Sequence, residues 1–442
     1  MKIAAIIAEY NPLHEGHIYH MEQTRQRTGA DFVVTILSGD FVQRGLPAIE
    51  EKFVRVRKAL EAGSDLVLEL PLPYALSSAE GFAFGGVSLA NQLGCVDYLS
   101  FGLEDEKNLD AMELLAREMN LQDLNDGNAN TEKSGADFSL HDEDTDLSTG
   151  CENDSLNFHN IIKNKVKEGF SYPDSVAQAA AAAFPVIETG FLSEKGNSNS
   201  ILALEYLRAL EHLGSSITPV AVARLGASYL SEYIPGHSYS VPSGSDSIDY
   251  TETSVYYPSA TALRAKLRET EPSNSPLLFS SDFSALLHYK LLSLSYEDLL
   301  QYREMTPQLA HKIMNALPQY KDYEQFANLL WTKNTTYSRV CRQLLYILLD
   351  IKKDTWDVYT QVPYARILGF RKSASPLLHQ MKESSSIPLI SKLADAPYVM
   401  SDRAQSLLNL EVRAGQIYDS VRQHKCGERL PGEYQKQIVI SS

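Results

Sequence analysis

Cysteine is scarce in this sequence and never occurs at a metal-binding spacing. Four cysteines, Cys95, Cys151, Cys341 and Cys426, are spread over 442 residues, with no Cys-x-x-Cys pair and no Cys and His at a zinc-ligand spacing. Neither a disulfide framework nor a structural zinc site is therefore expected. Each cysteine is predicted to be a small buried apolar side chain rather than a nucleophile.

Long apolar runs are absent as well. No run approaches the roughly 18 apolar residues that a membrane-spanning helix needs. The N-terminus, MKIAAIIAEY, lacks the longer apolar region and the small-residue cleavage site of a signal peptide, and its pattern predicts a strand. We therefore expect a cytoplasmic protein with no membrane partner, and no protein partner is evident.

Two common glycine-rich phosphate motifs are also missing. The sequence has no GxxxxGK[ST], so it is not a P-loop protein. It has no GxGxxG after a predicted strand, which disfavours a dinucleotide cofactor. Any nucleotide site must therefore be built from other residues.

The acidic residues are unevenly distributed. The net charge is -16, but residues 121–157 alone contain ten Asp or Glu and one Lys, so the rest of the chain is far less acidic. This segment has no apolar period and cannot bury enough surface to offset its ordering entropy, which predicts a mobile acidic insertion. Its DEDTD stretch lacks the Gly and the distal Glu of a calcium-binding EF-hand loop.

The first hundred residues alternate strand and helix patterns. The apolar runs KIAAIIA, FVVTIL, DLVLEL and DYLSFG predict strands, and helices are expected over 15–28, 48–62 and 77–93. Such alternation predicts a Rossmann-like α/β fold with a parallel sheet buried on both faces. Ligands bind such sheets at the carboxyl ends of the strands.

The remaining chain changes in character near residue 276. Helices are expected over 160–168, 175–184 and 200–213, followed by the strand TPVAVA, and the chain from 276 onward is predicted to be helical throughout. A chain of this length exceeds one ordinary domain. We therefore predict a catalytic domain over 1–275, interrupted by the insertion at 121–157, and an all-helical C-terminal domain over 276–442.

The stretch NPLHEGH follows the first predicted strand. His14 and His17 are three residues apart and share one face of the helix that begins there. Pro12 restricts the backbone before the helix, and Gly16 allows a ligand to approach the chain closely. A helix N-terminus favours anions, and two imidazoles add donors for phosphoryl oxygens. An ordinary surface helix start and an incomplete metal site are the alternatives, and placement after the first strand favours nucleotide binding.

NPLHEGH resembles the HxGH signature of the adenylyl-transferring α/β superfamily that includes class I aminoacyl-tRNA synthetases. The second signature of that superfamily, a KMSKS or ISSTxIR-like stretch, is matched by PSATALRAKL through Ser259, Thr261 and Arg264. The resemblance implies that these side chains meet the β- and γ-phosphates and stabilise the leaving pyrophosphate. An N-capped surface helix would use the same residues.

The resemblance extends over nearly the whole chain to the bacterial tRNA(Met) cytidine acetate ligase family. It includes IIAEYNPLHEGHIYH, SGDFVQRGLPAIEEKFVRVRKALEAGSDLVLELP, SFGLE, SILALEYLRAL and VARLGASY, in this order. It implies that acetate is activated by ATP, with Mg²⁺ accompanying ATP and no metal held by the protein. The acetyl group would then pass to N4 of the wobble cytidine of elongator tRNA(Met).

The resemblance also implies a set of ATP contacts. They are Ile7, Ala8, Glu9, Tyr10, Asn11, Pro12, Leu13, His14, Glu15, Gly16, His17, Ile18, Tyr19, His20, Gly102, Asn199, Arg224, Ser259, Thr261 and Arg264. Gly102 would leave room for a bound base or ribose, and Arg224 would pair with a phosphate; a turn glycine and a surface ion pair are the alternatives. Asn199 is also placed to cap a helix, and its surroundings, NSNSILALEY, depart from the usual family pattern.

Two further groups of residues are weaker candidates. Asp40 and Arg44, in SGDFVQRG after the second strand, are expected to orient the substrate, whereas Lys52, Arg55 and Arg57 are expected to be solvated charges. Basic and aromatic residues alternate in the C-terminal region, a composition suited to an RNA anticodon region. The basic residues predicted to bind tRNA are Lys333, Arg339, Arg342, Arg366, Arg371 and Lys372.

Two other functions remain open on the sequence alone. One is a nucleotidyltransferase that adenylates a small metabolite and uses no RNA. The other is an RNA-binding protein that has lost catalysis. The basic helical region argues against the first, and the intact HEGH and SATALR stretches argue against the second.

Overall fold

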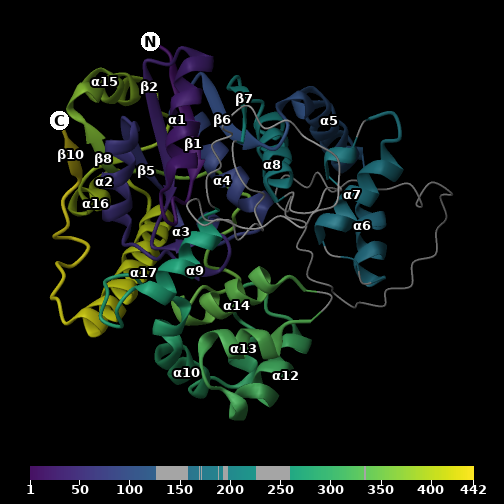
Figure 1. Ribbon diagram of the computed structural model, residues 1–442, viewed down its shortest axis with the longest axis vertical. Helices are drawn as coiled ribbons and strands as arrows, with labels where there is room; N and C mark the ends of the chain where they lie inside the picture. Colours follow the sequence, from purple (N-terminus) through teal and green to yellow (C-terminus); the bar gives the residue numbers. More distant parts are fainter. Residues whose placement is uncertain are drawn as a thin grey trace, which may run out of the picture.

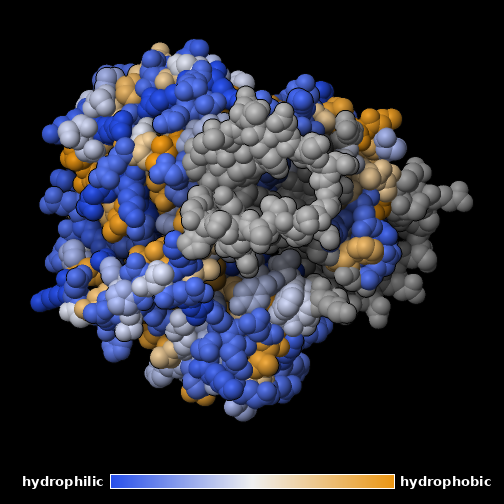
Figure 2. Space-filling view, in the orientation of Figure 1, coloured by the Kyte–Doolittle hydropathy of each residue, from blue (hydrophilic) through white to orange (hydrophobic). Residues whose placement is uncertain are grey.

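The computed structural model describes residues 1–125, 158–168, 170, 172–187, 189–192, 198–224, 259–332 and 335–442. A twisted sheet lies at the centre, with helices on both of its faces and a separate group of helices below it (Figure 1). Within the described part of the chain, no helix is long and apolar enough to cross a membrane. On the face seen in Figure 2, hydrophobic residues form small separate patches among hydrophilic ones.

The sheet has the order β10-β8-β5-β2-β1-β6-β7. Its parallel part comprises β1 (Ile3–Ala8), β2 (Phe32–Ser38), β5 (Leu66–Leu70), β6 (Tyr98–Leu103) and β7 (Thr218–Ala223). The chain runs outward from β1 through β2 to β5 and then returns to place β6 on the other side of β1. The carboxyl end of β1 is therefore a topological switch point, where open α/β sheets bind ligands.

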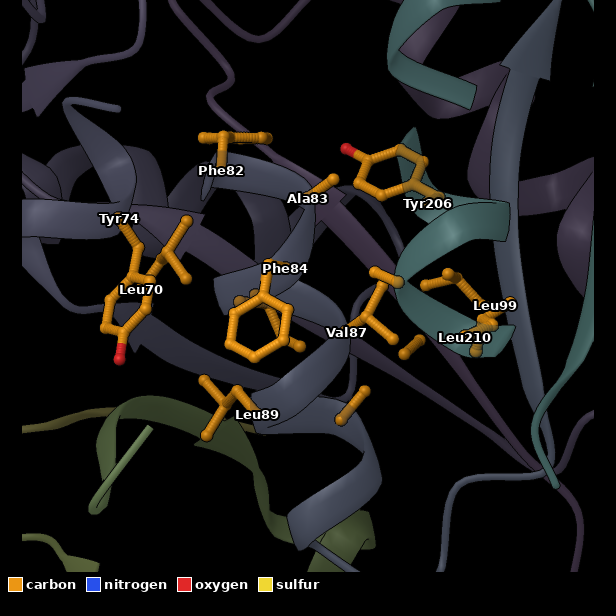
Figure 3. Packing of buried hydrophobic residues seen from close by; sticks show 14 of the residues in the cluster. Leu70, Tyr74, Phe82, Ala83, Phe84, Val87, Leu89, Leu99, Tyr206 and Leu210 are labelled. Atoms are coloured by element: carbon orange, nitrogen blue, oxygen red, sulfur yellow. The ribbon is translucent and has the colours of Figure 1, made fainter. Parts of the chain in front are cut away.

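Helices cover both faces because the strands are apolar on both sides. The helices that contact the strands of this sheet are α1 (Glu15–Thr28), α2 (Lys52–Ala62), α4 (Ala79–Gln92) and α8 (Ser198–His212). The other helices of this half pack on helices: α3 (Leu72–Ala75) on α4, α5 (Leu109–Asn125) on α8, and α6 (Phe158–Lys167) on α7 (Tyr172–Ala183). Figure 3 shows Val87 of α4 beside Leu99 of β6 and Leu210 of α8, in the largest apolar core. This packing fixes the strand ends from which the site projects.

A second core lies among the helices that follow residue 259. They are α9 (Ala260–Thr270), α10 (Ser284–Leu292), α11 (Tyr296–Leu299), α12 (Pro307–Ala316), α13 (Tyr323–Leu330) and α14 (Tyr337–Leu349). This core also includes Phe41 and Leu72 from the N-terminal half, and Leu410 of the long helix α17 (Asp402–Cys426). The helical group is therefore packed tightly against the sheet region.

The Rossmann-like sheet and the helical C-terminal region are confirmed, with one difference. The expectation of helix throughout 276–442 is wrong at β8 (Ala365–Arg371), β9 (Leu389–Ile390) and β10 (Val439–Ser441). β8 pairs antiparallel with β5, and β9 and β10 pair parallel with β8. The segment ARILGFR, expected to contact tRNA through Arg366 and Arg371, is a strand of the sheet in which Arg366 is buried. The division into domains at residue 275 stays a prediction.

The acidic insertion lies mostly outside the described residues. Its first five residues, 121–125, belong to α5, and Asp123 pairs with Arg208 of α8 at 2.8 Å, so the predicted start of the insertion was too early. Cys95 and Cys341 are buried as predicted, and Cys426 is half-buried. Cys151 lies outside the described part of the chain.

Candidate active site

The two histidines of the HEGH stretch cap helix α1. His14 is the N-cap residue, with an extended backbone, and its Nδ1 accepts a hydrogen bond from the backbone N–H of Gly16 at 3.1 Å. The Nδ1 of His17 accepts one from the backbone N–H of His14 at 3.2 Å. The two interactions form a reciprocal capping box that satisfies otherwise free N–H groups. Helix capping and a ligand-facing role are therefore compatible.

These hydrogen bonds also determine the tautomer of each ring. Because both Nδ1 atoms accept a hydrogen bond, the ring proton of each neutral imidazole is assigned to Nε2. Burial and the positive charges of Arg224 and Arg264 lower the pKa of His14 to about 4. Burial and the neighbouring His14 lower the pKa of His17 well below its usual value. Their rings stack with centroids 3.8 Å apart, so at neutral pH the pair presents two uncharged Nε2–H donors.

His20 lies deeper, against strand β6. Its Nε2 is 3.0 Å from the Oγ of Ser100, which is 2.7 Å from the Oγ1 of Thr24. Burial lowers the pKa of His20 to about 4. Ser100 and Thr24 cannot be identified from the sequence, because a single hydroxyl inside an apolar strand or a helix carries no motif. The Nε2 of His20 is therefore engaged with the sheet through Ser100.

The predicted second signature lies beside the first. Ser259 caps α9 by accepting a hydrogen bond from the N–H of Ala262 at 3.2 Å. Arg264 Nη1 donates to the backbone oxygen of Asn11 at 2.7 Å, and its Nη2 donates to Thr261 Oγ1 at 3.0 Å. Helix α9 lies between the sheet and α14 (Figure 1). The two signatures, about 250 residues apart in the chain, are thus joined by a direct contact.

The three isolated ATP candidates also converge, on a residue that sequence analysis did not single out. Arg224 Nη1 donates to Oε1 of Glu104 at 2.8 Å, and Asn199 Nδ2 donates to the same oxygen at 3.0 Å. A Cβ on Gly102 would lie 3.3 Å from Cγ of Arg224, so the glycine makes room for this arginine. Asn199 lies in the first turn of α8, which begins earlier than predicted.

Several side chains of the Ile7–His20 stretch bond to neighbouring backbone and so stabilise the conformation of the loop. Glu9 Oε1 accepts from the N–H of Gln43 at 2.8 Å, and Asn11 Oδ1 accepts from the N–H of Ile49 at 2.9 Å. Tyr10 is buried, which raises its pKa to about 12, and Pro12 is buried behind a cis peptide bond. The other members are half-buried or exposed: Ile7, Ala8, Leu13, Glu15, Gly16, Ile18 and Tyr19.

The expectation that Lys52 and Arg55 are solvated is wrong. Both are fully buried, whereas Arg57 is exposed as predicted. Arg55 Nη1 donates to the backbone oxygens of Glu9 at 2.7 Å and Ser38 at 3.0 Å, so it joins the ends of β1 and β2. An amphipathic helix pattern cannot reveal this, because a guanidinium becomes buried only when distant carbonyl oxygens surround it.

Asp40 does not reach the ligand edge. It is 4% exposed, and its Oδ1 accepts from the backbone N–H of Lys52 at 2.9 Å. Burial raises its pKa to about 7. The predicted substrate-orienting role of Asp40 is therefore wrong, because the carboxylate is enclosed. Arg44 is half-buried in the turn between β3 (Phe41–Val42) and β4 (Leu46–Pro47).

Arg366 is likewise enclosed and cannot bind RNA as predicted. Its Nη1 lies 2.7 Å from Glu69 and its Nη2 lies 2.8 Å from Glu433, with 5% of the side chain exposed. Lys52 Nζ pairs with the same two carboxylates, at 3.0 and 3.1 Å. Because the guanidinium of Arg366 is buried and paired with two carboxylates, it is not available to a phosphate.

The other basic residues do not form one surface. Arg342 is buried and donates to the oxygen of Gln43 at 3.3 Å, and Arg339 pairs with Glu304 at 3.3 Å. Figure 1 shows β8, which ends at Arg371, far from α14, which contains Arg339 and Arg342. Lys372 is exposed beside Arg371, and Lys333 lies outside the described residues.

Comparisons with known proteins find relatives of this chain over its whole length. A sequence model of the HIGH Nucleotidyl Transferase family matches residues 1–143 and 141–431. The chain is 31% identical to the tRNA(Met) cytidine acetate ligase of Acetivibrio thermocellus, with both chains fully covered, and 33% identical to that of Clostridium kluyveri over 95% of this chain and 98% of the relative. A Thermotoga maritima TmcAL structure bound with alpha-thio ATP shares the fold, with a TM-score of 0.78, 23% identity and full coverage of both chains.

Proposed function

Because this chain belongs to the tRNA(Met) cytidine acetate ligase family of HIGH nucleotidyl transferases, we propose that it activates acetate with ATP and acetylates N4 of the wobble cytidine of elongator tRNA(Met). One observation supports the ATP step most strongly. Arg264 of the SATALR stretch bonds the HEGH loop at Asn11, beside two neutral histidines at the switch point of the sheet.

In the first step, a carboxylate oxygen of acetate attacks the α-phosphorus of ATP. The bond from that phosphorus to the bridging oxygen breaks, acetyl-adenylate forms and pyrophosphate leaves. Negative charge grows on the phosphoryl oxygens, and the Nε2–H groups of His14 and His17 donate to them. Neutral donors suit this task because they require no proton transfer and stay available over the physiological pH range.

We assign the stabilisation of the leaving pyrophosphate to the positively charged groups at the same edge of the sheet. Arg264 and Arg224 supply fixed charge, and the hydroxyls of Ser259 and Thr261 lie at the positive end of α9. Magnesium is proposed to enter with ATP through the phosphate oxygens, the usual arrangement for this ion. Among the described residues, no group of three or more His, Cys, Asp or Glu side chains is placed to hold a metal.

In the second step, the N4 amine of cytidine attacks the acetyl carbonyl and AMP leaves, with the displaced proton passing to solvent or to the phosphate. The base must leave its stack to reach the pocket, which costs least in an anticodon loop. Arg339, Arg371 and Lys372 keep exposed or half-buried side chains and stay candidates for RNA contact. Arg366 is no longer one.

The experiment that tests this function is mass analysis of RNA. Elongator tRNA(Met) is incubated with the protein, MgATP and isotopically labelled acetate, then digested to nucleosides. We expect labelled N4-acetylcytidine from the wobble position, formed only when ATP and acetate are both present. Unmodified tRNA together with an adenylated small metabolite would support the nucleotidyltransferase alternative, and RNA binding without any product would support the non-catalytic one.

A further inference from the structure

Glu104 lies just beyond the carboxyl end of β6, next to the proposed ATP site. Its Oε1 accepts two hydrogen bonds, from Arg224 Nη1 at 2.8 Å and from Asn199 Nδ2 at 3.0 Å. These donors come from different elements, since Arg224 follows β7 and Asn199 lies in the first turn of α8. One carboxylate oxygen therefore ties together three elements of the sheet edge.

Arg224 is held at three points along its length. Its backbone N–H donates to the oxygen of Leu103 at 2.9 Å. Its side-chain stem passes over Gly102, where a Cβ would lie 3.3 Å from Cγ and 3.5 Å from Cδ. Its head reaches Glu104, and the described residues provide its guanidinium with no other hydrogen-bond acceptor. The side chain of Arg224 is thus positioned by Gly102, which its stem crosses, and by Glu104, which its guanidinium contacts.

The held guanidinium acts on the histidines through its charge. Its positive charge is one of the causes that lower the pKa values of His14, His17 and His20. Only one of the guanidinium nitrogens contacts Glu104, so donors remain for a phosphate. An arginine side chain without Glu104 would sample several rotamers and lose this placement.

We propose that Glu104 is a positioning residue that holds Arg224, together with Asn199, in the geometry that receives the triphosphate of ATP. The inference rests on the proposed function only in taking ATP as the ligand of this edge. Glu104 itself carries a negative charge and would repel phosphate, so its contribution to ATP binding comes from positioning Arg224. Preorganisation of one long side chain is worth about two- to tenfold in affinity.

The test measures the dissociation constant of MgATP by calorimetry for the full chain and its variants. We expect Glu104→Ala to weaken ATP binding about two- to tenfold. Glu104→Gln keeps an acceptor oxygen and should restore most of the affinity. Gly102→Ala displaces the stem of Arg224 from the other side and should weaken binding similarly. Thermal unfolding should be nearly unchanged for Glu104→Ala, because the group is a third exposed.

Glu106→Ala is the matched control. It removes the same charge two residues further along the chain, where Glu106 pairs with Arg27. It should leave ATP affinity unchanged. Equal shifts for Glu104→Ala and Glu106→Ala would show a general charge effect and would overturn the proposal, as would an unchanged affinity in Glu104→Ala.

A double-mutant cycle separates positioning from direct contact. If Glu104 acts through Arg224, then adding Glu104→Ala to Arg224→Ala produces no further loss of ATP affinity. A further loss of the same size as in the wild-type background would mean that Glu104 acts on ATP by itself, and the inference would fall. Wild-type protein that binds ATP but forms no acetyl-adenylate would refute the proposed function and leave this measurement intact.

Discussion

Two polar regions lie close together in this molecule and use their charges in opposite ways. At the nucleotide edge, the histidines are neutral, and the side chains of Arg224 and Glu104 are each about a third exposed. The buried charge cluster has almost no exposure; its members are Asp40, Lys52, Glu69, Arg366, Glu411 and Glu433. Lys52 and Arg366 form ion pairs with the other carboxylates, whereas Glu411 accepts a hydrogen bond from Tyr364 at 2.6 Å. Only the first region has donors left for a ligand.

The difference shows that a perturbed pKa alone does not locate an active site. Burial raises the pKa of Glu411 to about 8 and that of Asp40 to about 7, which are among the larger shifts of carboxyl groups in the protein. Such shifts are common at catalytic sites, but structural ion networks produce them too. Exposure distinguishes the two regions here, because the side chains of the cluster are buried, whereas those of Arg224 and Glu104 at the nucleotide edge are about a third exposed.

Arg55 connects the two regions. It is buried beside the cluster and donates to backbone oxygens of Glu9, at the end of β1, and of Ser38 and Gly39, at the end of β2. The cluster therefore supports the loops from which the site projects. Substitutions in the cluster should therefore lower stability, and substitutions at the nucleotide edge should lower activity.

The largest expected effect is on stability, from Arg366→Met. The substitution leaves Glu69 and Glu433 with one cation fewer, and breaking a buried ion pair costs about 3–5 kcal/mol. Urea unfolding measures the loss. Arg268→Met is the control, because Arg268 pairs with Glu324 on the surface, where the cost is about 0–1 kcal/mol. Equal small losses in both variants, with weakened tRNA binding by Arg366→Met, would instead support an RNA-binding role for Arg366.

The second effect is on chemistry, from His14→Ala and His17→Ala. Removing one preorganised donor to a developing oxyanion lowers the rate about 10²–10³-fold. Acetyl-adenylate formation should therefore become nearly undetectable in each variant, while circular dichroism shows an intact fold with a modest loss of helix capping. His379→Ala, in an exposed residue of α15 (Ser375–Ser384), should behave like the wild type. Near-normal rates in both active-site variants would refute their assigned role.

The third effect distinguishes the regions by pH. The depressed pKa values of His14 and His20, about 4, mean that the unfolded chain binds protons first as the pH falls below about 6.5, which destabilises the fold there. The raised pKa values of Asp40 and Glu411 mean that the native state holds protons that the unfolded chain has released. Above pH 6.5 the opposing effect of the histidines fades as the unfolded chain also loses its imidazole protons, and the carboxyl groups dominate, so stability should fall as the pH rises to 8.

Glu411→Gln provides the check on that pH dependence. The amide cannot ionise, so the fall in the free energy of unfolding between pH 6.5 and 8 should flatten in this variant. His14→Ala should not flatten it. A slope that is unchanged in Glu411→Gln would place its origin elsewhere than in Glu411, for example in Asp40 or in Glu80, whose pKa values burial raises to about 7.

The smallest effect is expected from shortening the acidic insertion. Removing residues 127–156 should leave acetyl-adenylate formation within about twofold of the wild type, since the sequence predicts no packed core in this segment. Removing 121–157 should cost stability in addition, because it deletes Asp123, which pairs with Arg208. A collapse of activity in the shorter deletion would show that the insertion serves the site.

The nucleotide edge could be predicted largely from the sequence because its parts are short local motifs. HEGH lies within one turn of a helix, and SATALR has its own cap, so each reveals its structure without its partner. Glu104 could not be identified this way, since a single carboxylate after a strand acquires meaning only when Arg224 and Asn199 meet it.

The buried charge cluster was not predictable by the same reasoning. Its members come from residues 40–69 and 366–433, and they lie in different settings: Glu69 is in the apolar strand β5, whereas Lys52 begins the charged helix α2. Lys52 and Arg366 were therefore misread, as was the strand that contains Arg366. Their burial is a property of tertiary pairing, which neither periodicity nor composition records.

The central claim is that the joined HEGH and SATALR segments transfer an adenylyl group to acetate. The most direct test is the exchange of labelled pyrophosphate into ATP by the purified protein, without tRNA, with and without acetate. We predict exchange that requires acetate and disappears in His14→Ala, His17→Ala and Arg264→Ala. Absence of exchange in the wild type, or exchange that is independent of acetate, would contradict the claim.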